Sequence, residues 1–217
     1  FLADPSVAIG SDGTLYFNAL LLDDRYRSTT FVARSTDEGN TWSQAKVPGS
    51  EGEDDKNHIT MDNNPGSPYQ NNIYTAFTDF RRYPYPIVFS RSTNHGKSFS
   101  PRNVISDSVG ELLAQGVNLA VGISGEVYAA WSGYDTWPAQ TTRLGFNKST
   151  DGGATWNRAK SLGNVRDLRG YLSKGGNSIR VSSFPSMAVD HSNSARRGWI
   201  YVVYVEKNSA QPDVFLI

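Results

Sequence analysis

The segment Ser149-Thr-Asp-Gly-Gly-Ala-Thr-Trp156 is the most informative part of the sequence, because close copies of it occur twice earlier in the chain. The copies are Ser35-Thr-Asp-Glu-Gly-Asn-Thr-Trp42 and Ser92-Thr-Asn-His-Gly-Lys-Ser-Phe99, so the three copies start at residues 35, 92 and 149, a spacing of 57. Asp accepts hydrogen bonds from backbone N–H groups of its own turn, and Gly permits a positive φ. We therefore predict that each copy is a hairpin turn, called here a staple turn, with the aromatic ring packed beneath it.

The residues expected to shape the staple turns occupy the same four positions of each copy. They are Ser35, Asp37, Gly39, Trp42, Ser92, Asn94, Gly96, Phe99, Ser149, Asp151, Gly153 and Trp156. Asn94 and Phe99 replace Asp and Trp in the second copy, and both replacements keep the expected roles. Their predicted role is structural.

Each staple turn closes a longer repeat unit. In the first unit, the apolar runs Val7–Ile9, Leu15–Phe17 and Phe31–Arg34 precede the turn, and the later units repeat this arrangement. Each unit therefore predicts four short antiparallel strands, which is the strand count of a propeller blade. The predicted fold is an all-β propeller of four-stranded antiparallel blades, about three and a half of them, with units at about 1–48, 49–105, 106–163 and an incomplete 164–217.

Composition excludes several classes of protein. The 217 residues include 21 basic and 21 acidic ones, so the zero net charge gives no electrostatic case for binding nucleic acid or an anionic membrane. A hydrophobic content of 38% is enough for a packed core and argues against disorder. The apolar runs are far shorter than the roughly 20 residues that span a bilayer. The absence of cysteine excludes disulfides, thiolate metal sites and cysteine nucleophiles.

The staple turns resemble the Asp-box, or bacterial neuraminidase repeat, of sialidases and related six- or seven-bladed propellers. This resemblance implies a sialidase-superfamily-like fold, and similar boxes also occur in non-sialidase propellers. Six blades of 57 residues would need more than the 217 residues present. We therefore expect the remaining blades to come from a longer chain or from a second copy. A stable monomer of this chain alone would contradict that expectation.

Strand direction sorts the polar residues into two ends of the blades. Turns between strands one and two and between strands three and four share one end, so the staple turns mark one face. The loops between strands two and three, and the crossovers between blades, form the opposite face, called here the loop face. Charged and aromatic residues on that face suit sugars, and ordinary solvated loops are the alternative. The predicted substrate-binding residues are Arg25, Lys56, His58, Arg81, Arg82, Tyr83, Asn118, Tyr134 and Trp137.

A subset of polar residues lies near the start of the predicted inner strands. These residues either line an axial channel structurally or serve a ligand there; they are Asp4, Asp55, Lys56, His58, Gln115 and Asn118. A glycoside hydrolase would need two carboxyl groups at a defined separation. The candidates near one rim are Asp4, Asp55, Asp79 and Asp135, and the catalytic residues stay unknown.

The resemblance to sialidases also implies three arginines that clamp the substrate carboxylate, a Tyr–Glu nucleophile pair and an Asp acid/base. The first of these arginines belongs to an Arg-Ile-Pro motif, which is absent from this sequence. The tyrosine and glutamate normally come from late blades. Whether the chain belongs to an enzyme therefore stays open.

Metal binding has weak support in the sequence. Glu51, Glu53, Asp54 and Asp55 offer oxygen ligands of the kind calcium prefers, although a solvated acidic loop is the reading we favour. The three histidines lack the spacing of a histidine metal site. We predict no metal or other cofactor, with Ca²⁺ as the alternative.

The sequence thus predicts a propeller that recognises a glycan or glycoconjugate on its loop face, with sialidase-type exo-glycosidase activity when complete. The alternative is a non-catalytic propeller that binds protein or assembles a surface complex. We expect neither a nucleic-acid partner nor a membrane span. We expect an extracellular or periplasmic protein whose signal peptide lies outside the given sequence.

Overall fold

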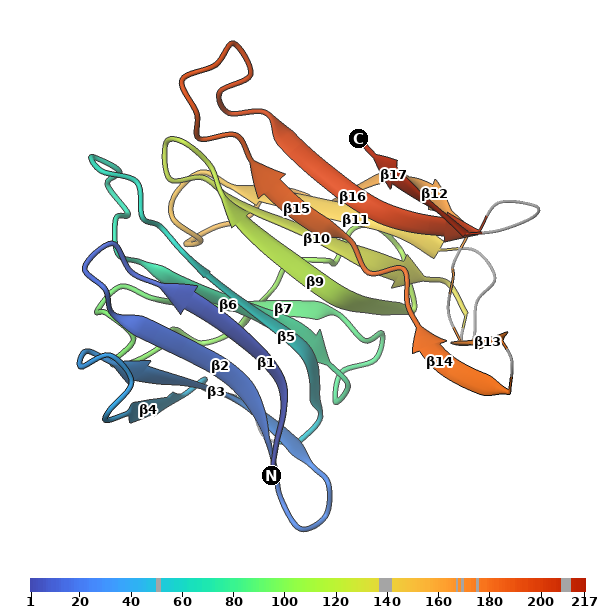
Figure 1. Cartoon of the computed structure of the whole chain (residues 1–217), viewed down its shortest axis with the longest axis horizontal. Coiled ribbons are helices and arrows are strands. Elements are labelled where there is room, and N and C mark those ends of the chain that lie inside the picture. Colours follow the sequence, from blue (N-terminus) through green and yellow to red (C-terminus); the bar gives the residue numbers. More distant parts are fainter. Residues whose placement is uncertain (50–51, 137–141, 167, 169, 175, 208–211) are drawn as a thin grey trace.

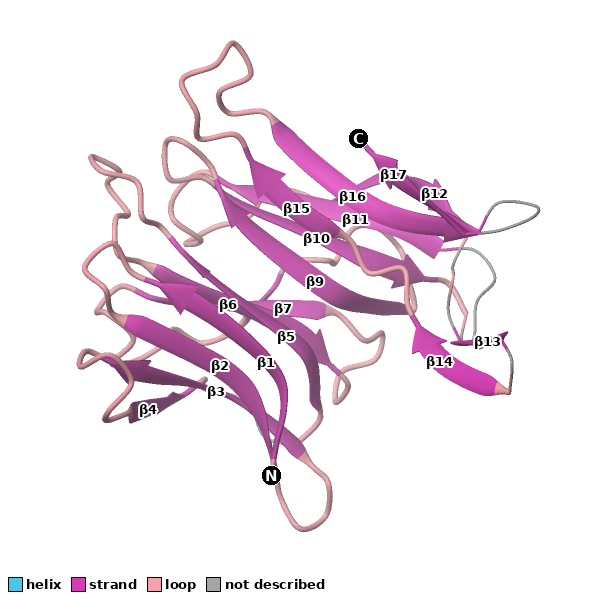
Figure 2. Ribbon diagram, in the orientation of Figure 1, coloured by secondary structure: helices cyan, strands magenta, loops and turns pink. Residues whose placement is uncertain are grey.

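The computed structural model describes residues 1–49, 52–136, 142–166, 168, 170–174, 176–207 and 212–217. Its secondary structure consists of strands joined by turns and loops (Figure 2). In the described part of the chain no helix is long and apolar enough to cross a membrane.

The strands form successive antiparallel sheets in chain order, each a simple meander (Figure 1). The first sheet contains β1 (Leu2–Ile9), β2 (Leu15–Leu22), β3 (Ser28–Ser35) and β4 (Ser43–Lys46). The second contains β5 (Asp54–Met61), β6 (Ile73–Asp79), β7 (Ile87–Ser92) and β8 (Asn103–Val104). The third contains β9 (Leu113–Val121), β10 (Val127–Tyr134), β11 (Thr142–Ser149) and β12 (Lys160–Val165).

A three-stranded fourth sheet follows, with β15 (Ser186–Val189), β16 (Ile200–Lys207) and β17 (Pro212–Leu216). The first strands of the four sheets, β1, β5, β9 and β15, contact one another in that order, as they do around a propeller axis. Figure 1 shows them next to one another in the arc. This confirms the predicted fold, a partial β-propeller of four-stranded antiparallel blades whose fourth blade is incomplete.

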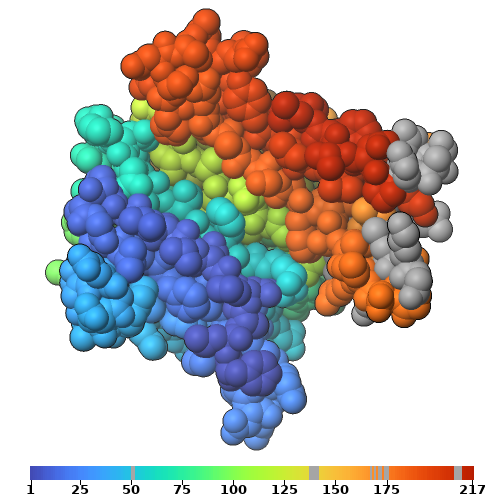
Figure 3. Space-filling view, in the orientation of Figure 1, coloured from blue at the N-terminus to red at the C-terminus, as the bar shows by residue number. Residues whose placement is uncertain are grey.

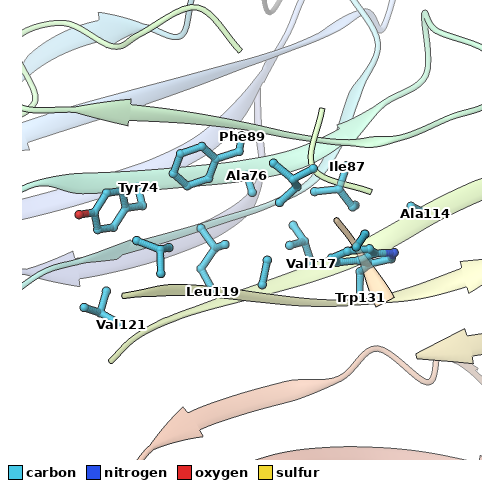
Figure 4. Packing of buried hydrophobic residues seen from close by; sticks show 13 residues of the cluster. Tyr74, Ala76, Ile87, Phe89, Ala114, Val117, Leu119, Val121 and Trp131 are labelled. Atoms are coloured by element: carbon cyan, nitrogen blue, oxygen red, sulfur yellow. The ribbon is translucent and has the colours of Figure 1, made fainter. Parts of the chain in front are cut away.

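The hydrophobic core lies between the blades. The largest cluster joins Tyr74 and Phe89 of the second blade to Leu119 and Trp131 of the third (Figure 4). Sheets packed on both faces need apolar residues on both sides of the strand, and every residue of β10 is buried. The first strand of the chain has no such cover on one side, because the burial of β1 alternates and Val7 and Ile9 are more than half exposed.

The staple turns have the predicted hydrogen bonds. The backbone N–H of Thr155 donates to Asp151 Oδ1 at 2.8 Å, and the hydroxyls of Thr155 and Ser149 donate to the same carboxylate. Asp37 makes the equivalent bonds, and those from Thr41 and Ser35 lower the pKa of its carboxyl to about 2. The turn is therefore held by a charged acceptor at its centre.

Each later staple turn packs against the blade before it. A Cβ added to Gly153 would lie 2.6 Å from the ring of Phe89, and the φ of this glycine is +78°. The Trp156 ring meets the same Phe89 ring edge-on, with centroids 4.8 Å apart. No described blade precedes the first one, and its Trp42 remains 45% exposed. The glycine at this position therefore serves both turn geometry and close approach between blades.

A two-stranded hairpin is inserted ahead of the fourth blade. It consists of β13 (Gly170–Lys174) and β14 (Asn177–Val181), in the part of the chain that the repeat pattern assigns to a plain crossover. Figure 1 shows it at the lower right, on the same side as the chain start at the N label. The hairpin is therefore an insertion relative to the 57-residue repeat, and it extends the loop face.

Candidate functional site

Three inner strands carry the same irregularity near the loop face. In β1, β5 and β9 the register against the neighbouring strand shifts, and one residue inside each shift has a left-handed backbone. These residues are Asp4 (φ 48°), Lys56 (φ 52°) and Gly116 (φ 69°). A positive φ is uncommon for residues other than Gly, and β-bulges are frequent beside binding sites because they redirect side chains. Asp4 and Lys56 are therefore strong candidates for function.

A cavity of about 550 Å³, the axial cavity, opens beside these two bulges. Its wall comes from the first two blades: the start of β1, the start of β5, and the loops after β2 and β6. The polar and aromatic residues that line it are Asp4, Tyr26, Ser28, Glu53, Asp54, Asp55, Lys56 and Phe80. Three sequence candidates, Asp4, Asp55 and Lys56, are thus brought together from chain positions about 50 residues apart.

Charges within the axial cavity are paired in a definite way. Lys56 Nζ donates to Asp4 Oδ2 at 3.0 Å, and both side chains are about one third exposed. Asp55 accepts a hydrogen bond from the side-chain amide of Gln115 in the third blade. Burial raises the pKa of the Asp55 carboxyl, with opposing effects from the nearby Lys56. Of the carboxyl groups that line the cavity, that of Asp4 is therefore ion-paired, whereas those of Asp55 and Asp54, whose pKa values burial raises, retain their protons more readily.

His58 and Asn118 connect consecutive blades. In each blade the residue that follows the bulge accepts the backbone N–H of the next inner strand, so the blades are linked in series. The pairs, all 3.2 Å long, are Ile59 N to Ser6 Oγ, Leu119 N to His58 Nδ1 and Met187 N to Asn118 Oδ1. Burial lowers the pKa of His58 to about 4, so its imidazole is neutral at pH 7. The two predicted ligand-binding residues therefore hold the blades together.

The inserted hairpin borders a second, smaller cavity of about 270 Å³ that shares Lys56 with the axial cavity. Arg180 of β14 and Phe184 line it. Phe184 lies over the bulge of β9, where a Cβ on Gly116 would come within 2.1 Å of its ring. The repeat pattern gave no sign of Arg180 or Phe184, because their segment has no counterpart in the other units.

Asp79, Arg81 and Arg82 line a different cavity. It has a volume of about 350 Å³, and Arg102, Val88 and Val104 complete its wall. Arg102 Nη1 lies 3.1 Å from Asp79 Oδ2 and 3.9 Å from Asp54 Oδ1. No sequence signal marked Arg102, which precedes a strand of only two residues. We call this space the arginine cavity.

The other predicted site residues lie apart from the axial cavity. Asp135 forms an ion pair with Arg143 at 2.7 Å. Tyr134 is completely buried at the end of β10, whereas Tyr83 is 75% exposed. Arg25 is exposed in the loop between β2 and β3. Trp137 lies outside the described residues.

The acidic run considered for calcium does not converge. Asp54 Oδ2 accepts the backbone N–H of Thr30 in the first blade, whereas Asp55 turns to Gln115 in the third. Neighbouring residues of a strand point to opposite faces, which explains the divergence. Among the described residues, no group of three or more His, Asp or Glu side chains could hold a metal ion, and Glu51 lies outside them.

A fourth cavity, of about 580 Å³, lies on the staple-turn side of the inner strands. Polar and apolar residues both line it. Among them His191 contacts the carbonyl of Val121 at 2.9 Å, and Arg197 donates to the carbonyl of His191 at 2.8 Å. None of the described residues that line it carries a carboxylate. The axial cavity therefore offers the richer chemistry. In Figure 3, atoms of the second and third blades are visible between the blue first blade and the orange fourth blade.

Comparison with known proteins supports the fold. No family model matches this sequence, and no curated protein sequence matches it. Among solved structures, a protein of unknown function from Dyadobacter fermentans is similar with a TM-score of 0.62 and 13% identity, over 100% of this chain and 60% of that chain. An α-L-arabinanase of Penicillium chrysogenum complexed with arabinobiose gives 0.56 and 12% identity, over 99% and 60% of the two chains.

The intramolecular trans-sialidase of Ruminococcus gnavus, in complex with oseltamivir carboxylate, is also similar. Its TM-score is 0.54 at 14% identity, over 94% of this chain and 40% of that chain. This chain therefore spans 60% or less of the length of these three solved chains. The fold resembles that of carbohydrate-active propeller glycosidases.

Proposed function

We propose that this chain is part of a secreted, sialidase-superfamily-like propeller that recognises a glycan on its loop face. The observation that carries the proposal is the axial cavity, which Asp4, Asp55 and Lys56 line together with the aromatic residues Tyr26 and Phe80. Carboxylates and an ammonium group suit sugar hydroxyls, and aromatic faces suit the C–H faces of a sugar ring. The left-handed backbone at Asp4 and Lys56 is energetically unfavourable for residues other than glycine, and a strand with a purely structural role does not require it.

We further propose that the complete protein is an exo-glycosidase. Hydrolysis of a glycosidic bond uses one carboxylic acid that protonates the leaving oxygen and a second carboxylate that acts as nucleophile or base. Asp55, whose pKa is raised by burial, suits the acid, and Asp4, paired with Lys56, suits the ionised partner. The similar arabinanase structure was solved with a disaccharide, which supports a saccharide as the ligand class.

Substitution at Asp55 tests this proposal. In the complete protein, Asp55→Asn is expected to lower glycoside turnover by about 10²- to 10⁴-fold, the usual effect of removing a general acid. Lys56→Ala is expected to weaken glycan binding. Turnover is measured with fluorogenic arabinosides and sialosides, and binding with a glycan array.

Asp135→Asn is the matched control, because Asp135 lies on the same face but pairs with Arg143 away from the cavity. Equal losses in Asp55→Asn and Asp135→Asn would contradict the site. If the protein binds glycans but does not hydrolyse them, the proposed glycan recognition stands and the proposed glycosidase activity is rejected. Neither binding nor turnover would favour the second candidate, a non-catalytic scaffold that binds protein, for which the exposed apolar edges of the first and fourth blades provide a surface.

Those apolar edges also support our proposal that further blades complete the ring, from a longer chain or a second copy. Val7 and Ile9 in β1 and Val214 and Leu216 in β17 are each more than half exposed. Exposed sheet surface of this kind promotes association. The purified 217-residue chain is therefore expected to self-associate in light-scattering measurements. A stable monomer at high concentration would contradict this expectation.

A further inference from the structure

The arginine cavity is lined by residues of the second blade and is distinct from the axial cavity. The segment that follows β6 separates the two spaces: Phe80 lines the axial cavity, while Asp79, Arg81 and Arg82 line the arginine cavity. Arg102 enters from the segment before β8. Three guanidinium groups from two separate segments therefore face one space of about 350 Å³.

Asp79 fixes the orientation of two of these arginines. Its side chain is only 3% exposed, Arg81 Nε lies 3.2 Å from Oδ1, and Arg102 Nη1 lies 3.1 Å from Oδ2. A guanidinium group held through one edge keeps its other N–H groups in a fixed plane. A second nitrogen of the Arg81 guanidinium group donates a hydrogen bond to the carbonyl of Gly49. The cavity thus has preset donors rather than free side chains.

Positive charge is in excess at this place. Three guanidinium groups face the carboxylates of Asp79 and Asp54. When both carboxylates are ionised, the group of five side chains carries a net charge of one positive unit. Within the part of the chain that the structure describes, exposed Arg82 has no ion-pair partner. Arg102 Nη1 lies at ion-pair distance from Asp79, yet neither it nor Asp54 Oδ1 makes a hydrogen bond of good geometry to a described residue. A network that served only to join the two blades would need neither Arg82 nor an open cavity.

We propose that the arginine cavity binds a tetrahedral oxyanion, a sulfate or phosphate group. Guanidinium groups form paired, charge-assisted hydrogen bonds with such oxygens. The cavity is several times larger than the roughly 30 Å³ of a water molecule, so it has room for an attached group as well as the ion. The ligand is either the free ion or the ester group of a larger molecule. This binding does not depend on glycan recognition in the axial cavity.

Titration calorimetry of the complete protein with sodium sulfate and with sodium phosphate tests the proposal. Sodium chloride at equal ionic strength serves as the reference, because it separates binding from charge screening. Both oxyanions are expected to bind and chloride is not. Arg82→Gln is expected to weaken binding by roughly tenfold, the effect of losing one charge-assisted hydrogen bond. Since Arg82 is exposed and makes no ion pair with a described residue, this variant is expected to fold normally.

Two further variants complete the design. Arg102→Lys keeps the charge beside Asp79 but removes the planar fork, and it is expected to weaken binding as well. Arg25→Gln removes an exposed arginine from another loop of the same face, outside the cavity, and is expected to leave binding unchanged. A sulfated monosaccharide that binds more tightly than inorganic sulfate would identify the ester as the source, whereas equal affinity would identify the free ion. The proposal is overturned if neither oxyanion binds, or if both binding constants survive Arg82→Gln and Arg102→Lys.

Discussion

Replacement of Trp131 by alanine is expected to lower the free energy of unfolding by about 3–5 kcal/mol, the usual range for a fully buried tryptophan. Trp131 is completely buried between the second and third blades (Figure 4). Its indole lies over Gly145 on the neighbouring strand, where an added Cβ would approach to 2.2 Å.

Trp131 also donates a hydrogen bond to a buried carboxyl group, that of Glu111. Its Nε1 donates to Glu111 Oε1 at 2.8 Å, and burial raises the pKa of Glu111. Trp131→Phe keeps an aromatic ring but removes this donor, so it is expected to cost about 1–3 kcal/mol, the desolvation cost of an unpaired polar group. The two variants separate the packing contribution from the hydrogen-bond contribution.

Trp42→Ala provides the control, because Trp42 is 45% exposed in the first staple turn. Chemical unfolding followed by circular dichroism gives all three values on one scale. Trp42→Ala is expected to cost clearly less than Trp131→Ala. Equal losses at the two positions would show that the interface between the second and third blades is not the main core.

The pH dependence of stability is expected to reveal two buried groups that oppose each other. Burial raises the pKa of Asp54 from 3.8 to about 6, so the folded chain holds this proton more tightly and stability decreases as the pH rises from about 4 to 6. Burial lowers the pKa of His58 from 6.5 to about 4, so the unfolded chain takes up a proton that the folded chain does not. Stability therefore decreases through His58 as the pH falls from 6.5 to 4.

Each of these shifts corresponds to about 3 kcal/mol at 1.36 kcal/mol per pKa unit. Because the two effects have opposite signs in nearly the same range, they largely cancel in the natural sequence. We expect the joint contribution of Asp54 and His58 to vary little between pH 4 and 6.5, whereas Asp55 and Glu111, whose pKa values burial also raises, lower the stability as the pH rises. Asp37 and Asp151, whose pKa values are lowered to about 2, act below this range.

Asp54→Asn separates the two effects. Asparagine can still accept the N–H of Thr30 but carries no charge, so the variant is expected to be about 3 kcal/mol more stable than the parent at pH 7 and equally stable near pH 4. The contribution of His58 to its stability should then fall by about 3 kcal/mol between pH 6.5 and 4, opposed by Asp55 and Glu111, whose pKa values burial raises. The attraction of Asp54 to Arg102 is weak at 3.9 Å and does not reverse the sign.

Urea unfolding at half-unit pH intervals measures these differences. His58→Asn in the otherwise unchanged sequence is the complementary variant, because asparagine is polar but does not titrate. The stability of this variant should increase as the pH falls, because Asp54 still titrates. If Asp54→Asn destabilises the protein at pH 7, the carboxylate contributes more through Arg81 and Arg102 than burial costs it, and the expected sign is wrong.

The strand order of each blade and the face that carries its staple turn could be predicted from the amino-acid pattern. A turn such as 149–156 is stabilised by residues within four positions of Asp151, and the strands on either side show alternating or continuous apolar character. These interactions are local, so a repeated pattern is enough to predict them. Strand order in a meander then places the staple turns on one face and loops such as 23–27 on the other.

Which polar residues contact one another became visible in the three-dimensional fold and not in the amino-acid pattern. Lys56 reaches Asp4 because both lie in bulges of neighbouring inner strands, and Arg102 joins Asp79 because a short outer strand folds back beside β7. His58 and Asn118, predicted to bind a ligand, also form hydrogen bonds with the next blade. Such contacts depend on a one-residue register shift and on the packing of blade against blade, and neither leaves a periodic signal in the sequence.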